Sequence, residues 1–480
     1  IDSGGASVIL GNVTVQHGDF VGRDKIIITP PAPRPGPRPD AVRTAYLKRL
    51  VRECGALRLL GLDTSAGQAG VDRESDVRLE AVYIHLDTER AVPGKEKEME
   101  RPRQMTALEA VAHFPQLALT GGPGAGKSTL GSYLALCLAV HGLPREDRPF
   151  ALDPGKHLPS WPDDLWPLPV RVILRDFARE LPAETRRGSA DLLWQHIVSR
   201  LKPLGEFEDA LKGALLEGQA LVVLDGLDEV PETSPEREVS PRRLVLQAVE
   251  EFALSTFPET RTLVTCRVAS YVSPWTLPRF EIAPLAEFDQ EKRDLFCQLW
   301  YRELVRRGQL DTDKLAVKVG GLQEAVRRPD LERMAGNPLL LTVMALVHAR
   351  EPELPEARAL LYERCVDVLL WLWERRKEDE TRPADLLSLL QEANVDRTFF
   401  VRALDRLAYD VHQQGGSQEG EADIRASFLE RRLEKLHPQS DPGWARRVAT
   451  FIRERAGLLV EREADEDDPV LAFLALLSGC

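Results

Sequence analysis

Two short segments of the chain hold residues suited to phosphate chemistry. The first reads GGPGAGKST and fits the pattern G-x-x-x-x-G-K-[ST]. In such a loop the glycines let backbone N–H groups point at one centre, the lysine reaches the outer phosphates of a nucleotide, and the hydroxyl holds Mg²⁺. A glycine-rich turn without a ligand is the plain alternative. We expect these residues to bind the nucleotide: Gly121, Gly122, Pro123, Gly124, Ala125, Gly126, Lys127, Ser128 and Thr129.

The second segment, LVVLDGLDEVP at Leu221 to Pro231, follows an apolar run with the carboxylates Asp225, Asp228 and Glu229. Like charges this close repel each other unless a cation lies between them. Because the first segment implies a magnesium nucleotide, we expect Asp225 to bind Mg²⁺, directly or through a water molecule, together with Ser128. Asp228 and Glu229 would orient the attacking water, one of them as the base. An acidic turn that merely ends a strand is the alternative.

Four strand-like segments must position these residues. They are QLALT before the glycine-rich loop, residues 168–177, ALVVL before Asp225, and residues 261–267, while an apolar pattern after the loop predicts a helix. Their order predicts a doubly wound α/β sheet with the ligand at the carboxyl ends of the strands. Arg267 would then face the outer phosphate and sense hydrolysis, unless it forms a surface ion pair. For Arg175 the surface ion pair is the favoured reading.

Composition limits the classes of function. The chain has 480 residues, of which 43% are apolar and 29% charged, which predicts several domains. A net charge of −13 argues against non-specific electrostatic binding to nucleic acid or to anionic lipid. The six cysteines form no C-x-x-C pair, which favours a reduced, cytoplasmic chain without structural zinc. The longest apolar run, residues 339–347, is too short to cross a bilayer, so no membrane partner is expected.

The remaining segments predict the outer organisation. Residues 1–29 alternate apolar and polar positions and are expected to form a short β-hairpin element, and residues 30–39 form a proline-rich linker. Residues 40–105 are expected to form a linker region with a helix and then a strand at Val77–Asp87. Beyond residue 283 most segments are expected to be helical, among them Leu339–Ala349, Ala357–Arg375 and Phe399–Gln414.

Several motifs together resemble one family. GGPGAGKST, PVRVILRDFA, LVVLDGLDEVP, RTLVTCR, MAGNPLLLTVMALV and LPEARALLYERCVDVLL are similar to the NACHT group of signal-transducing ATPases, of the STAND class, in the bacterial form related to NOD-like receptors. Gly226 followed by Leu227-Asp228-Glu229 resembles the NACHT variant of the Walker B motif, whereas ordinary AAA+ machines have adjacent Asp-Glu. The resemblance implies a nucleotide-binding domain at 106–282, a helical domain at 283–360 and a winged-helix and helical region at 361–480.

The resemblance also implies a mechanism. In this family ADP holds the helical and winged-helix domains closed, and a sensed ligand permits exchange for ATP and assembly into a homo-oligomer. Pro338 of Asn337-Pro338 would lie near the adenine, or would simply begin a helix. Relatives have a winged-helix histidine that touches the β-phosphate, but this chain has Ala475 there, so this region is either truncated or divergent. His412, expected on a helix surface, is no substitute. The role of the N-terminal GDFVGRDKI stays open between pairing with another chain and docking on its own domain.

Three functions remain open at this point. The first is a slowly hydrolysing ATP/ADP switch with Mg²⁺ in bacterial defence or stress signalling, with an unidentified sensor ligand and effector. The second is an AAA+ motor acting on nucleic acid or protein, which Gly226 and the acidic net charge disfavour. The third is a nucleotide-binding scaffold without hydrolysis, which the intact Asp228 and Glu229 disfavour.

Overall fold

The computed structural model describes residues 39–56, 77–91, 104–122, 124–201, 207–230, 237–350, 354, 386–414, 423–454, 459–463 and 470–473. The predicted N-terminal hairpin, nearly all of the proline-rich linker, the helix predicted for Ala357–Arg375 and the position of Ala475 lie outside these residues.

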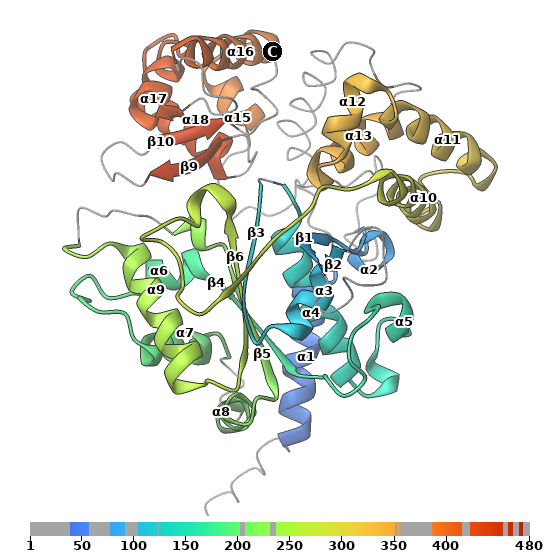
Figure 1. The fold of residues 1–480 in the computed structure, drawn as a ribbon. Coiled ribbons are helices and arrows are strands. Elements are labelled where there is room, and N and C mark those ends of the chain that lie inside the picture. Colours follow the sequence, from blue (N-terminus) through green and yellow to red (C-terminus); the bar gives the residue numbers. More distant parts are fainter. Residues whose placement is uncertain are drawn as a thin grey trace, which may run out of the picture.

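A five-stranded parallel sheet forms the centre of the molecule (Figure 1), in the order β4-β5-β6-β3-β7. The strands are β3 (Gln116–Gly121), β4 (Leu168–Ile173), β5 (Ala220–Asp225), β6 (Arg261–Arg267) and β7 (Glu281–Pro284). The prediction of an α/β protein with a parallel sheet is therefore confirmed. The predicted strand at 168–177 is too long, because α6 (Leu174–Glu180) begins after Ile173. β7 was not predicted, and it crosses the expected domain boundary at residue 282.

Helices cover both faces of this sheet (Figure 1), so its strands are buried on both sides and consist of nearly continuous apolar runs. Alternate side chains of the strands enter two separate cores. One core packs against α3 (Ala107–His113) and α4 (Lys127–Gly142), and the other against α6, α7 (Ala190–Leu201) and α9 (Pro241–Glu251). The sheet and α4 thus form a rigid base for the loop between β3 and α4.

The helix expected in the 40–105 region is present, and further short helices lie within residues 106–282. Helix α1 (Pro39–Cys54) packs against α4, and Tyr46 Oη on α1 donates to the carbonyl of Pro169 at 2.8 Å. The other elements are η2 (Arg145–Asp147), α5 (Pro154–His157), α8 (Glu208–Leu216), η4 (Leu227–Glu229), η5 (Phe252–Thr256) and η6 (Val268–Ser270).

The strand predicted at Val77–Asp87 is wrong. Residues 79–82 form the short helix α2 (Leu79–Val82), and the strand β1 (Asp87–Ala91) begins only at Asp87, where it pairs antiparallel with β2 (Gln104–Thr106). Leu79 and Val82, one helical turn apart, are both buried. The buried carboxylate of Glu303 accepts from Arg78 Nη2 at 3.2 Å, which holds the start of this segment against α10 (Gln290–Arg306).

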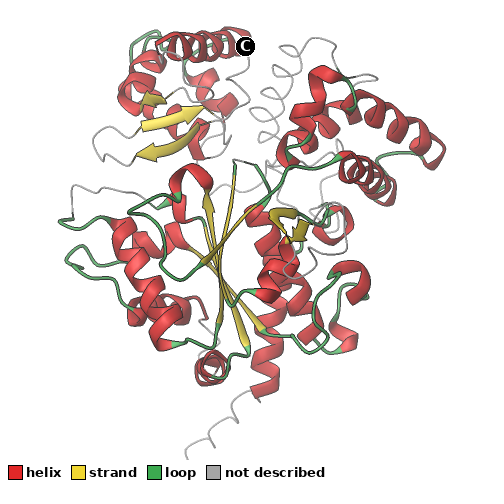
Figure 2. Cartoon of the chain, in the orientation of Figure 1, coloured by secondary structure: helices red, strands yellow, loops and turns green. Residues whose placement is uncertain are grey.

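Two smaller parts follow the sheet (Figure 2). Helices α10, η7 (Thr312–Lys314), α11 (Leu315–Val326), α12 (Pro329–Ala335) and α13 (Pro338–Arg350) form the first. The second contains α15 (Leu386–Glu392), α16 (Arg397–Gln414), α17 (Ala426–Glu434), α18 (Pro442–Glu454) and an antiparallel sheet of β8 (Asp423–Arg425), β10 (Val470–Phe473) and β9 (Leu459–Glu463). The helices predicted at Leu339–Ala349 and Phe399–Gln414 are confirmed as α13 and α16, and His412 lies in α16. None of the helices in the described part of the chain combines the length and apolar character needed to span a bilayer.

Candidate functional site

The glycine-rich loop joins the end of β3 to the start of α4. Gly124 and Gly126 have φ values of +72° and +91°, which L-amino acids with a side chain rarely adopt. The first N–H groups of α4 face the loop without helical partners, as at every helix N-terminus, and favour an anion there. Lys127 Nζ donates to the carbonyls of Gly121 at 2.8 Å and Gly122 at 2.9 Å. Burial lowers the pKa of Lys127, and the nearby Asp228 opposes this shift. Pro123 lies outside the described residues.

Asp225, at the tip of β5, is buried with 5% of its surface exposed. Ser128 Oγ donates to Asp225 Oδ1 at 2.8 Å, and Thr265 Oγ1 on β6 donates to the same oxygen at 2.7 Å. Arg171 Nη2 on β4 donates to Oδ2 at 2.7 Å. A hydroxyl and a carboxylate oxygen side by side are ligands that suit Mg²⁺, so Ser128 and Asp225 fit the predicted metal. The contacts of Thr265 and Arg171 with Asp225 were not predicted from the sequence.

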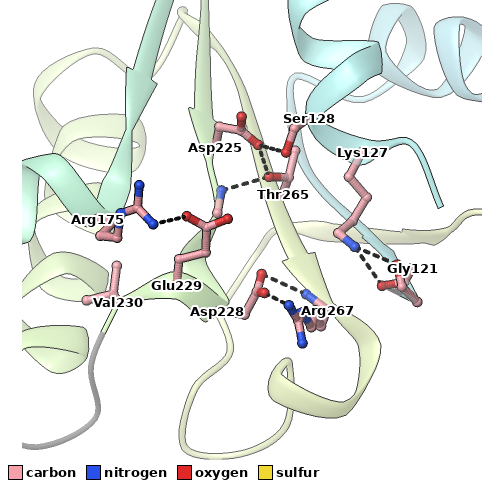
Figure 3. A network of polar contacts seen from close by, with 12 residues as sticks. Gly121, Lys127, Ser128, Arg175, Asp225, Asp228, Glu229, Val230, Thr265 and Arg267 are labelled. Atoms are coloured by element: carbon pink, nitrogen blue, oxygen red, sulfur yellow. Dashed lines mark hydrogen bonds and ion pairs between the residues drawn. The ribbon is translucent and has the colours of Figure 1, made fainter. Parts of the chain in front are cut away.

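Asp228 and Arg267 form a close pair (Figure 3). The backbone N–H of Arg267 donates to Asp228 Oδ1 at 3.0 Å, and Arg267 Nε lies 2.9 Å from Oδ2. The carboxylate of Asp228 is 9% exposed and the side chain of Arg267 is 20% exposed. The guanidinium of Arg267 is therefore held beside the loop by an acidic neighbour.

Glu229 is held more loosely. Arg175 Nη1 lies 3.5 Å from Glu229 Oε2, and the side chain of Glu229 is 42% exposed. The surrounding protein desolvates the carboxyl and raises its pKa; Arg175 opposes this shift, and Asp228 adds to it. Arg175 lies in α6 and makes the ion pair that was favoured for it, with a partner inside the site (Figure 3).

A cavity of about 280 Å³ connects these groups. Its polar end is lined by the loop from Gly124 to Thr129 and by Asp228, Glu229 and Arg267. The other end is largely apolar and is lined by Leu79, Val82, Tyr83, Ile84, Leu86, Phe288, Phe296, Pro338, Leu339 and Thr342. A cavity with a charged end and an apolar end matches a ligand that has phosphates and a flat base.

Pro338 begins α13 and lines the apolar end. Next to it, the backbone N–H of Leu339 donates to the carbonyl of Gly124 at 3.2 Å, so α13 contacts the glycine-rich loop directly. The sequence did not predict the contributions of residues 79–86, Phe288 and Phe296. The apolar residues of VRLEAVYIHL were the available signal, but their spacing predicts a strand and does not indicate contact with a ligand.

Fold and site together define an α/β protein with a parallel sheet and a cavity at the carboxyl ends of its strands. A family model described as the winged helix-turn-helix domain C-terminal to NACHT matches residues 358–473. A search of curated proteins finds no match. The family match indicates a C-terminal winged-helix domain and supports a NACHT-family protein, a family whose members are generally NTPases.

Proposed function

We propose that the chain is a signalling switch that binds ATP or ADP with Mg²⁺ and hydrolyses ATP slowly. The observation that carries the proposal is that Lys127, Asp228 and Arg267 line the same cavity as the first turn of α13. A ligand there touches both the sheet domain and the helical domain. Such a ligand can couple the two domains, because a nucleotide shifts a domain equilibrium when it binds the two states differently.

The residues around the cavity have separable roles. Lys127 and the N–H groups at the start of α4 would bind the phosphates, and Ser128 and Asp225 would hold Mg²⁺, which neutralises phosphate charge when bound. The apolar end, with Pro338, would bind the base. The preference for adenine over guanine comes from the family resemblance. The sequence has no Asn/Thr-Lys-x-Asp motif, the motif that recognises guanine.

Among the acids, Glu229 is better suited than Asp228 to accept a proton from water. Arg267 occupies both oxygens of Asp228, while Glu229 has one long contact with Arg175 and is 42% exposed. Desolvation raises the pKa of Glu229, which makes its carboxylate a stronger base. Asp228 would then position Arg267 near the outer phosphate.

The switch itself would act through α13 and the winged-helix domain. The Leu339 N–H to Gly124 carbonyl bond ties α13 to the loop. β9 of the winged-helix part lies beside η4, the turn that contains Asp228 and Glu229. Oligomerisation on ligand sensing, and a role in bacterial defence or stress signalling, follow from the resemblance to NACHT proteins.

The test is the nucleotide that copurifies with the chain, together with its turnover. The wild type is expected to retain adenine nucleotide and to hydrolyse it slowly. Lys127→Ala is expected to lose the nucleotide, and Glu229→Ala to keep it without hydrolysis. Lys314→Ala removes an exposed lysine on η7 and serves as the matched control. Fast turnover stimulated by DNA or unfolded protein would favour a motor, and retention without any turnover would favour a scaffold.

A further inference from the structure

The carboxylate of Asp225 is surrounded by donors from three other elements. Ser128 and Thr265 donate to Oδ1, and Arg171 donates to Oδ2. Lys127 Nζ instead donates to the carbonyls of Gly121 and Gly122. Among the described residues, the cationic group in direct contact with the carboxylate of Asp225 is therefore the guanidinium of Arg171.

Arg171 occupies an unusual position for a charged residue. It lies in the middle of β4, paired with Val223 of β5. Its side chain reaches Asp225, which follows Val223 by two residues on β5. The side chain is 22% exposed, and its buried Nε has no hydrogen-bond partner among the described residues. A partly buried guanidinium with an unpaired N–H is costly. Its contact with Asp225 is the compensation that the structure offers.

We infer that Arg171 is a countercharge with which a divalent cation at Ser128 and Asp225 must compete. This inference rests on the proposed nucleotide site. A cation bound to Asp225 comes close to the guanidinium, and like charges at that distance repel each other. Arg171 thus weakens the uptake of Mg²⁺ and holds Asp225 in place when the metal leaves. It is a positioning residue for the metal ligand and determines how much Mg²⁺ the nucleotide site requires.

The two roles that Arg171 can have predict opposite changes. If it only supports the shape of the site, its loss frees Asp225 to move, and more Mg²⁺ is needed. If it competes with the metal, its loss leaves Asp225 without a countercharge, and less Mg²⁺ is needed. We expect the second result, with about a tenfold lower Mg²⁺ concentration at half-saturation, the scale of one charge contact at a partly exposed site.

The experiment titrates Mg²⁺ into the full chain with a fluorescent ADP, starting in chelator. Arg171→Met and Arg171→Gln remove the charge, and Arg171→Lys keeps it. Arg90→Met is the matched control, because Arg90 also makes a 2.7 Å ion pair, with Glu281 at the start of β7, at the opposite end of the sheet from the cavity. The neutral variants are expected to need about a tenfold lower Mg²⁺ concentration than the wild type. The Lys and Arg90→Met variants are expected to stay within about threefold of it.

Two results would overturn the inference and leave the proposed function intact. One is a neutral variant that binds ADP but needs as much Mg²⁺ as the wild type or more. The other is loss of folding in both neutral variants while the Lys variant folds, which would assign Arg171 a structural role. A wild-type chain that binds no ADP at any Mg²⁺ concentration would instead overturn both the proposed function and this inference.

Discussion

Replacing Gly226 with alanine is expected to slow hydrolysis while nucleotide binding persists. Gly226 has φ +81°, and its N–H donates to Thr265 Oγ1 at 2.8 Å, so the backbone cannot relax freely. A Cβ atom there would lie 3.1 Å from Glu229 Cδ and 3.3 Å from Glu229 Cγ, closer than ordinary contacts. The side chain of Glu229 must then move by a few tenths of an ångström.

Two effects add at this position. The left-handed backbone costs an alanine about 1–2 kcal/mol of folding stability. The displaced carboxyl is expected to lower the hydrolysis rate by about tenfold, which corresponds to about 1.4 kcal/mol in the barrier. ADP affinity should change by less than about threefold, because Gly226 lies beside Asp228 and Glu229 and is not part of the glycine-rich loop.

The assay compares Gly226→Ala with Gly308→Ala. Gly308 has φ +69°, but a Cβ atom there would meet nothing within 4 Å. Both variants should lose similar stability in urea unfolding, and only Gly226→Ala should release phosphate more slowly. If Gly226→Ala hydrolyses at the wild-type rate, or Gly308→Ala is slowed equally, the assignment of Glu229 as the base fails.

Three further predictions concern the same cavity. Arg267→Ala is expected to lower phosphate release by at least about tenfold, because it removes a cation from the site and leaves Asp228 Oδ2 without the guanidinium; unchanged release would argue against a sensing role. Arg175→Ala removes one of the two cations that oppose the raised pKa of Glu229, so that pKa rises further and the acid limb of the rate against pH should move to higher pH; a shift to lower pH would contradict this. Gly124→Ala would place a Cβ atom 2.7 Å from Leu339 Cβ, so calorimetry should show ADP binding weakened by at least about tenfold; unaltered binding would show that the contact with α13 is dispensable.

The strands of the central sheet were predictable because burial on both faces requires continuous apolar runs. ALVVL therefore appears in the structure as β5, and RTLVTCR, a mixed segment whose two threonines are also buried, appears as β6. The segment Val77–Asp87 was not predictable in this way. Its apolar spacing fits a strand and a short helix almost equally, and contacts distant in sequence, such as that of Arg78 with Glu303, accompany the fold that forms.

The site shows the same division. The glycine-rich loop and the acidic turn with Asp225, Asp228 and Glu229 are each a local motif, so each could be recognised in the sequence. Their proximity, with Ser128 and Asp225 97 residues apart along the chain, was expected because both motifs follow strands of one parallel sheet. Arg171 and Thr265 reach Asp225 only because β4 and β6 flank β5, and the order of strands in a sheet cannot be deduced from apolar runs. The apolar end of the cavity combines residues 79–86, which precede the sheet strands in sequence, with residues of the 288–342 region, which follow them. No local sequence motif connects these two segments.

The decisive measurement is isothermal calorimetry of the full chain with ATP and ADP, in Mg²⁺ and in chelator, after any copurified nucleotide has been removed. We expect one bound nucleotide per chain, loss of binding in Lys127→Ala and retention in Lys314→Ala. Absence of any adenine nucleotide binding by the folded wild type, with or without a divalent metal, would contradict it.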